Sequence, residues 1–163
     1  MMVPLTRLGL PLRHPAALLA TWFGAGLLPW APGSWGSLAA LPFAWAIEWR
    51  FGQAGLAIAA ILVFAAGCWA ADTVARAGAV RDPGFVVIDE VAAQWLVLAA
   101  APHSLSAYAI GFLLFRIADV IKPWPARWAD RALHGGLGIM LDDVFAALYA
   151  GAALFLLWSL GIA

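Results

Sequence analysis

Five carboxylates in the sequence stand beside apolar segments, where an unpaired charge is unfavourable. Asp89 and Glu90 are adjacent, Asp119 stands alone, and Asp142 and Asp143 are again adjacent. Like charges at close range repel one another unless a cation joins them. Oxygen ligands with no Cys and little His favour a hard ion, and Mg²⁺ often bridges carboxylates and a substrate phosphate. These segments therefore favour a Mg²⁺ site, with solvated or capping carboxylates at helix starts as the alternative.

Charged residues occur at regular spacing in another segment, FRIADVIKPWP over 115–125. Arg116, Asp119 and Lys122 recur every three residues, so they share one face of a predicted helix that Pro123 ends. Together with Arg127, this face offers the positive charge that phosphoryl transfer uses. A salt-bridged stripe that extends to a membrane interface is the alternative interpretation.

Two glycine-rich segments could bring backbone groups close to a ligand. The first, GAGLLPWAPGSWGS over 24–37, cannot be a regular helix throughout, and we expect a helix to begin at Ser34. Its N–H groups and hydroxyls, including those of Gly33 and Ser37, could bind an anion, although no Walker pattern follows. The second, HGGLGIMLDD, starts at His134, and its glycines permit close approach of the backbone. A plain interfacial turn and a structural histidine are the alternatives.

Composition indicates which elements must position these residues. Of 163 residues, 65% are hydrophobic and 11% are charged, and the mean hydropathy is +0.92. A soluble domain has roughly 45–50% apolar residues. We therefore predict one domain over 1–163 with an all-α fold, a polytopic membrane helical bundle of about four to five apolar helices with Gly/Pro-rich interfacial loops. The predicted spans are 34–49, 51–71, 91–101, a short helix that ends by about 116, and 144–163, after an apolar lead-in at 16–28.

Charge is sorted between the two ends of these spans. When the predicted crossings are followed, eight of the nine Lys and Arg residues fall on one side, and Arg50 falls on the other. The positive-inside rule makes the side with eight cations cytoplasmic. Glu48 is the one acid expected on the opposite side. Nearly all the polar chemistry is therefore expected at the cytoplasmic face.

Composition also excludes several classes of protein. Nine Lys and Arg balance nine Asp and Glu, and no basic stretch occurs, so we expect no nucleic-acid partner. The lone cysteine, Cys68, cannot form an internal disulfide, and its apolar neighbours argue against a thiol nucleophile or a Cys-ligated zinc. The sequence specifies no oligomeric state.

The four motifs, in this order and across nearly the whole chain, resemble the phosphatidylglycerophosphatase A family of bacterial membranes. Ser34 stands where a Thr is usual in the family, and Ala93 stands where a Gly is usual. The matching residues are Gly24, Gly26, Pro29, Pro32, Gly33, Gly36, Ser37, Asp89, Glu90, Arg116, Asp119, Lys122, Pro123, Pro125, His134, Gly135, Gly136, Gly138, Met140, Asp142 and Asp143. The resemblance thus rests on four separate signatures, and neither departure changes an ionisable group.

The resemblance implies a Mg²⁺-dependent lipid phosphatase in the bacterial cytoplasmic membrane. Its phospholipid substrate, phosphatidylglycerophosphate, would lose the terminal phosphate to give phosphatidylglycerol and inorganic phosphate. The expected Mg²⁺ ligands are Asp89, Glu90, Asp142 and Asp143. We expect Asp119 to be a further ligand or the base that orients water.

A mechanistic hypothesis for this activity assigns roles to the residues around the acids. The expected substrate-binding residues are Arg116, Lys122, Arg127, Gly33, Ser34, Ser37 and His134. Lys122 would also act in catalysis, by stabilising the charge that develops at phosphorus. A water activated by the metal is the simplest nucleophile, and a phospho-aspartyl intermediate is the alternative.

Other functions fit parts of the pattern. The residues suit any anionic headgroup, so phosphatidate or a polyprenyl phosphate is an alternative substrate. A CDP-alcohol phosphotransferase would carry an Asp-Gly-x-x-Ala-Arg signature, which is absent. A small divalent-cation transporter would use the same carboxylates, but such sites usually lie midway across the membrane. A purely structural subunit leaves the acidic residues unexplained.

Overall fold

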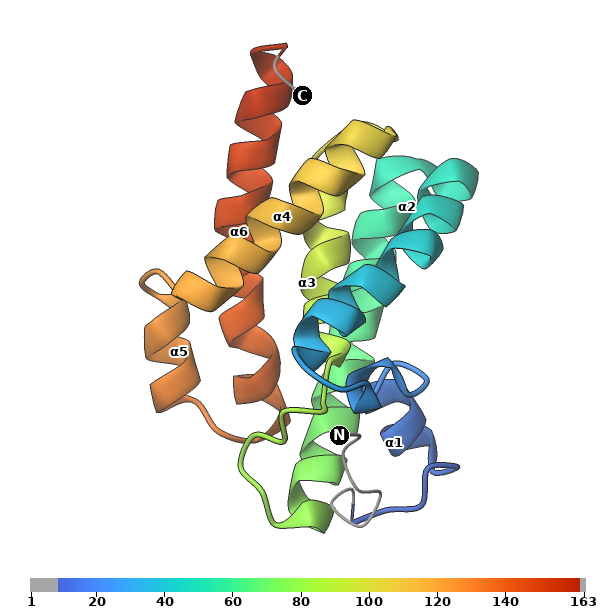
Figure 1. Ribbon diagram of the computed structural model, residues 1–163, viewed down its shortest axis with the longest axis vertical. Coiled ribbons are helices and arrows are strands. Elements are labelled where there is room, and N and C mark those ends of the chain that lie inside the picture. The colour runs from blue at the N-terminus through green and yellow to red at the C-terminus, as the bar shows by residue number, and fades with distance from the viewer. Residues whose placement is uncertain (1–8, 162–163) are drawn as a thin grey trace.

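The structure is a computed structural model that describes residues 9–161 apart from the side chain of Asp130. These residues form seven helices of very different lengths. Within these residues there is no strand, so the all-α prediction is confirmed (Figure 1). The elements are α1 (Pro15–Ala20), the 3-10 helix η2 (Ala25–Leu27), α2 (Pro32–Gly78), α3 (Ile88–Leu98), α4 (Leu105–Ile121), α5 (Ala126–Ala132) and α6 (Gly135–Ser159).

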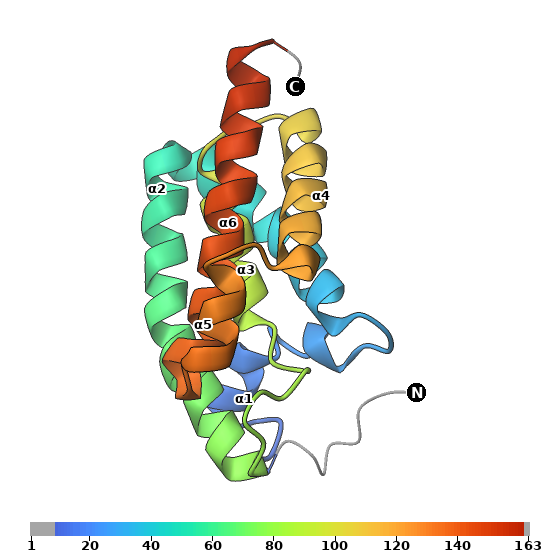
Figure 2. The same ribbon diagram turned by 90° about the vertical axis from the view of Figure 1, so that its left-hand side faces the viewer.

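The longest helix, α2, is a hairpin of two helical arms. Gly52 has φ 69° and ψ −176°, which no α-helical residue adopts, and the chain reverses there (Figures 1 and 2). Glycine allows this backbone conformation because it has no Cβ. The two spans that the sequence predicts on either side of Arg50 correspond to these arms.

The start of α2 differs from the prediction. The helix begins at Pro32, with Ala31 at the N-cap position, so the expectation that Ser34 opens the helix is wrong. Proline is favoured in the first turn because its fixed φ suits a helix and its missing N–H is not needed there. Ser34 therefore lies within the first turn of α2.

The apolar lead-in and the last span also differ from the prediction. The lead-in at 16–28 is not one helix, because Trp22 and Phe23 have positive φ values between α1 and η2. The last helix, α6, begins at Gly135 rather than near 144. Asp142 and Asp143 consequently lie within the helix, in its third turn, and do not cap it.

Helix α3 is the centre of the bundle. Apart from Gln94, its residues after the first turn are apolar on all sides, which is typical of a helix that is buried all round. Figure 2 shows α3 surrounded by α2, α4 and α6. The Trp95 Nε1 donates to the carbonyl oxygen of Ala40 at 2.9 Å, which fixes α3 against the first arm of α2. Gly111 of α4 lets that helix approach the side chains of Leu98 and Leu154.

Two of these helices are long and apolar enough to cross a membrane, namely α2 and α6. Large apolar side chains also point outward, including Leu62 (65% exposed), Val120 (76%) and Phe155 (60%). Exposed apolar surface of this extent marks a membrane or protein contact. With 11 residues, α3 is about 16 Å long, roughly half the hydrocarbon thickness. The prediction of four to five crossings therefore stays a prediction.

The helix ends divide into two groups. One end of the bundle holds the start of α2, the segment 79–87, α5 and the start of α6, and the other holds Gly52, the 99–104 turn and the end of α6 (Figure 1). Arg50 and Glu48 lie at the second end, whereas the remaining described Lys and Arg residues lie at or near the first. Arg7, which the sequence assigns to the first end, lies outside the described residues.

Candidate active site

Three carboxylates from two helices meet where the start of α3 packs against α6. Asp89 and Glu90 lie in the first turn of α3, and Asp143 lies in the third turn of α6. One oxygen atom from each residue lies within 4.8 Å of the other two. The position follows from packing, since Ala93 of α3 and Ala146 of α6 belong to the same buried apolar cluster. We call these three acidic residues the carboxylate cluster.

Several oxygens of the carboxylate cluster lack a hydrogen-bond donor. Asp89 Oδ1, Glu90 Oε2 and Asp143 Oδ2 are buried, and no N–H or O–H of the described residues donates to them. Burial of a charged group without a partner is unfavourable. A divalent cation would neutralise these charges and use oxygen ligands of this kind.

The acids of α3 titrate abnormally. Asp89 and Glu90 stand before the apolar part of the helix. Burial first, and then the charge of Asp143, raise the pKa of Glu90 to about 8. Burial, followed by the charge of Glu90, also raises the pKa of Asp89 well above its ordinary value. Both shifts have the same physical cause, because desolvation and like charges disfavour the ionised form.

Cations approach the acids from α4. Arg116 Nη1 lies 2.8 Å from Asp119 Oδ2 and 3.9 Å from Glu90 Oε1. Lys122 directly follows the last residue of α4 and has a left-handed backbone conformation, with φ 47°. Its Nζ donates to Asp142 Oδ2 at 2.6 Å. The predicted face of α4 therefore brings Arg116 and Asp119 to the carboxylate cluster, while Lys122 contacts the acid next to it.

The glycine-rich start of α2 also reaches the carboxylate cluster. Gly33 is buried, and a Cβ atom at this position would overlap Glu90 Oε1 and lie 3.2 Å from Arg116 Nη1. Only glycine lets the backbone come this close to the acid and the cation. Ser37, one turn further along, is fully buried and its Oγ has no hydrogen-bond partner among the described residues. Ser34 is half-buried in the first turn.

Other predicted residues lie outside the carboxylate cluster. Asp142 is 7% exposed and is held by Lys122 beside the cluster. His134 is exposed, its Nδ1 lies 3.1 Å from the carbonyl oxygen of Ala132, and it lines a small separate pocket together with Asp142. Arg127 Nη2 donates to the carbonyl oxygen of Ile121 at 3.2 Å, at the end of α4.

One buried polar residue near the site is not predicted by the sequence motifs. Gln94 lies one helical turn after Glu90 in α3 and is fully buried. Neither its Oε1 nor its Nε2 has a hydrogen-bond partner among the described residues. Its spacing of four from Glu90, inside an otherwise apolar helix, is the signal that places both on one helical face.

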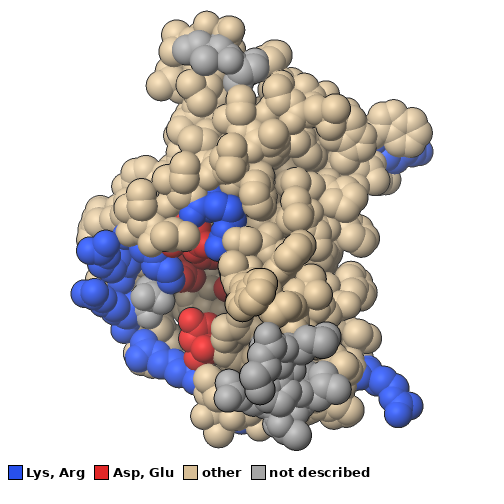
Figure 3. All heavy atoms as spheres, viewed as in Figure 1, with Lys and Arg blue, Asp and Glu red and all other residues tan. Residues whose placement is uncertain are grey.

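The acids of the site lie deeper in the molecule than the cations. Figure 3 shows a hollow with Asp and Glu side chains inside it and Lys and Arg side chains around its rim. Such a site can hold a cation between buried carboxylates and an anionic group against the rim. Opposed charges of this kind stabilise a transferring phosphoryl group.

Comparison with known proteins gives consistent matches. The family model for phosphatidylglycerophosphatase A matches residues 18–158. Phosphatidylglycerophosphatase A of Escherichia coli strain K12 is 40% identical over 157 residues, which cover 94% of this chain and 91% of the relative. Phosphatidylglycerophosphatase A of Haemophilus influenzae is 42% identical over 146 residues, which cover 88% and 89%. A relative from Bacteroides thetaiotaomicron, provisionally named a phosphatidylinositol-3-phosphatase, is 36% identical over 146 residues, which cover 82% and 87%. No solved structure matches the chain.

An apolar helical bundle with buried acids beneath a cationic rim is the arrangement of an enzyme that acts on anionic groups at a membrane. The chain belongs to the phosphatidylglycerophosphatase A family, and it is therefore a phosphatase. The resemblance carried by the four sequence motifs is thereby confirmed. The two long apolar helices and the lipid phosphatase family together indicate a membrane protein.

Proposed function

We propose that the protein hydrolyses phosphatidylglycerophosphate to phosphatidylglycerol and inorganic phosphate in a Mg²⁺-dependent reaction. The observation that carries the proposal is the carboxylate cluster, in which buried oxygens of Asp89, Glu90 and Asp143 lack donors. The names of the Escherichia coli and Haemophilus influenzae relatives supply the substrate. The reaction serves phosphatidylglycerol synthesis, since phosphatidylglycerol is the lipid product.

The donor set fits Mg²⁺. All three residues of the carboxylate cluster offer oxygen ligands, and no thiol or imidazole of the described chain belongs to the cluster. Asp142 is the fourth acid expected as a ligand, and its Oδ2 accepts a hydrogen bond from Lys122. Mg²⁺ bound there would neutralise negative charge on the substrate phosphate.

The cations and Asp119 have complementary roles. We assign binding of the phosphomonoester to Arg116 and Lys122, whose charges stabilise the negative charge that develops on the phosphoryl oxygens. Asp119 lies beside Arg116, and it would accept a proton from the attacking water. The water oxygen bonds to phosphorus while the bond from phosphorus to the glycerol oxygen breaks, and that oxygen takes up a proton.

The location proposed is the bacterial cytoplasmic membrane, with several crossings and the active site at the cytoplasmic face. The support is the apolar outer surface, the length of α2 and α6, and the gathering of the cations at the end of the bundle that holds the carboxylate cluster. A site at that end would lie level with the lipid headgroups.

Phosphate release by the purified protein in mixed micelles tests the proposal. Phosphatidylglycerophosphate and phosphatidate are compared, each with Mg²⁺ and with EDTA. We expect release from the first lipid only, and loss of that release with EDTA. Release that persists in EDTA would contradict the Mg²⁺ requirement, and no release from folded protein would contradict the substrate.

Hydrolysis of a different lipid phosphate is the second candidate. The provisional name of the Bacteroides thetaiotaomicron relative supports it, because that name refers to another phosphomonoester lipid. Preferential release from phosphatidate in the same assay would favour this candidate. Cation transport has less support, since the carboxylate cluster lies at one end of the bundle and transport sites usually lie midway.

A further inference from the structure

A second cationic surface lies next to the carboxylate cluster, around the short helix α5. It forms an open pocket of about 680 Å³ lined by three cations and two indoles, namely Lys122, Arg127, Arg131, Trp124 and Trp128. We call it the cationic pocket. No acidic side chain contributes to its lining among the described residues, so it is suited to an anion.

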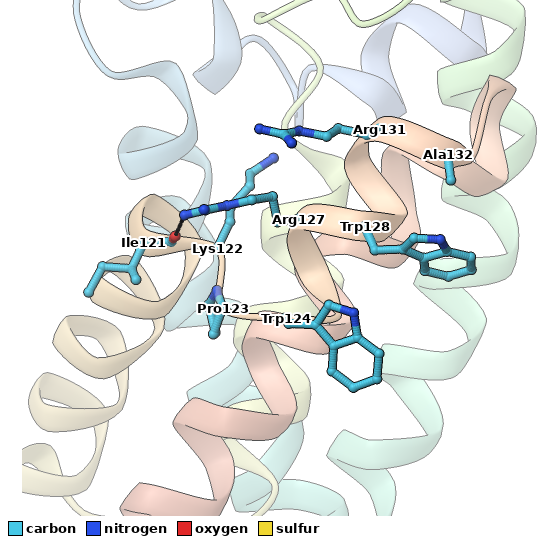
Figure 4. A pocket seen from close by; sticks show the side chains of 8 residues that line it. All are labelled: Ile121, Lys122, Pro123, Trp124, Arg127, Trp128, Arg131 and Ala132. Carbon is cyan, nitrogen blue, oxygen red and sulfur yellow. Dashed lines mark hydrogen bonds between the residues drawn. The ribbon is translucent and has the colours of Figure 1, made fainter.

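The charged and the aromatic side chains of the cationic pocket point in different directions. Figure 4 shows the charged ends of Lys122, Arg127 and Arg131 on one side of α5 and the indole rings of Trp124 and Trp128 on the other. The two indoles are 77% and 52% exposed. Exposed tryptophans beside arginines are typical of a segment at a membrane interface, because the indole is apolar with one polar N–H. We therefore expect α5 to lie at the level of the lipid headgroups.

Lys122 connects the cationic pocket to the active site. It lines the pocket, and its Nζ contacts Asp142, which adjoins the carboxylate cluster. An anion bound to Arg127 and Arg131 would thus lie beside the reacting phosphate, on the side of α5 that holds the charged ends. A lipid that carries two phosphates joined by one glycerol unit could occupy both sites at once.

We propose that Arg127 and Arg131 bind the internal phosphodiester of the lipid and so select substrates that have two phosphates. The inference rests on the proposed function, and it changes the role expected of Arg127 from the sequence. The hydrolysed phosphomonoester lies at the carboxylate cluster, and the phosphodiester stays bound in the cationic pocket after hydrolysis. Phosphatidate has a single phosphate, so it cannot occupy the carboxylate cluster and the cationic pocket at once.

The test separates the two products. Phosphatidylglycerol keeps the phosphodiester, whereas inorganic phosphate comes from the phosphomonoester, so each product reports on one site. We compare the wild type with the double variant Arg127→Gln, Arg131→Gln, and we measure inhibition of turnover by each product. The matched control is Arg76→Gln, because Arg76 is 80% exposed at the same end of the molecule and pairs with Asp72 away from the pocket.

We expect the double variant to bind phosphatidylglycerol roughly tenfold more weakly, as for the loss of charge-assisted hydrogen bonds. KM for phosphatidylglycerophosphate should rise by a similar factor, with inhibition by inorganic phosphate unchanged. A variant with Arg127→Gln and Arg131→Lys should recover part of the affinity for phosphatidylglycerol, because lysine restores the charge at 131 without the planar guanidinium. Arg76→Gln should behave as the wild type.

Three results would overturn the inference. These are unchanged inhibition by phosphatidylglycerol, equal weakening of both products, and an equal effect of Arg76→Gln. Failure of the proposed function is distinguishable, since the wild type would then release no phosphate from phosphatidylglycerophosphate. Direct binding of phosphatidylglycerol in neutral micelles, measured by calorimetry on the same proteins, tests the cationic pocket even in that case.

Discussion

Buried carboxylates occur at both ends of the bundle, and their surroundings differ. At the end with Gly52, Glu48 is 5% exposed and accepts a hydrogen bond from the Tyr108 hydroxyl at 2.7 Å. The rings of Trp45 and His103 pack around that contact, with centroids 3.7 Å apart. At the other end, three acids of the carboxylate cluster crowd together, and each has a buried oxygen without a donor.

The difference separates a structural acid from acids that await a ligand. Buried polar groups in folded proteins almost always have a hydrogen-bond partner, so groups without one require an explanation. Glu48 has its partner within the fold, and it joins α2 to α4. The carboxylate cluster is unfavourable for stability as it stands, which a bound cation would reverse. Loss of an acid from the carboxylate cluster should therefore reduce turnover, whereas loss of the Glu48 contact should reduce the stability of the fold.

The largest expected effect comes from neutralising an acid of the carboxylate cluster, with Glu48 at the other end as the control. Asp143→Asn should lower kcat by about 10³-fold, in the range known for loss of a principal electrostatic group, because it removes a ligand of the proposed Mg²⁺ site. Glu48→Gln should keep a rate near the wild type, since Tyr108 can donate to the amide oxygen. Phosphate release and thermal unfolding are measured on both. A fully active Asp143→Asn enzyme would contradict the assignment.

Steric intrusion into the carboxylate cluster should have the next largest effect. Gly33→Ala introduces a Cβ that overlaps Glu90 Oε1, and displacement of the acid by a fraction of an ångström to 1 Å should reduce turnover roughly 10- to 100-fold. Gly84→Ala is the matched control, because nothing lies within 4 Å of its Cβ position. Equal activity of the two variants would show that the contact between Gly33 and Glu90 does not matter for catalysis.

Sequence reasoning predicts the site better than the helix boundaries. The sequence places Arg116, Asp119 and the two acidic pairs beside apolar helices, which leave charged groups few places to lie. The structure brings all of them except Asp142 to the carboxylate cluster. The sequence predicts a last span that begins near 144, after Asp142 and Asp143, but Gly136 and Gly138 already lie within α6, so that boundary moves to Gly135. Neither the contact of Gly33 with Glu90 nor the cationic pocket around Arg131 can be predicted from sequence, since both depend on how α2, α4 and α5 pack.

A smaller effect is expected on the dependence of Mg²⁺ binding on pH. Burial and the charge of Asp143 raise the pKa of Glu90 to about 8, so below that pH Mg²⁺ must displace a proton. The apparent affinity for Mg²⁺ should therefore increase with pH up to about 8, by at most about tenfold per unit for one proton. Activity titrated with Mg²⁺ at several pH values measures this. Glu48→Gln should leave the pH dependence of Mg²⁺ affinity in place. If the dependence were lost in that variant, Glu48 rather than Glu90 would be the group responsible.

The smallest effect on turnover is expected from Tyr108→Phe, which removes the donor to Glu48 and leaves that carboxylate buried without it. Because an unsatisfied buried acceptor costs about 1–3 kcal/mol, the midpoint of thermal unfolding in micelles should fall while kcat stays unchanged. Tyr149→Phe is the control, since the Tyr149 hydroxyl donates to the carbonyl oxygen of Trp124 at 2.6 Å on an exposed surface and its loss should cost less. If Tyr108→Phe instead lowered kcat without changing stability, the acid at the Gly52 end would be coupled to the chemistry. The two ends would then no longer be separable into one that holds the fold and one that binds the substrate.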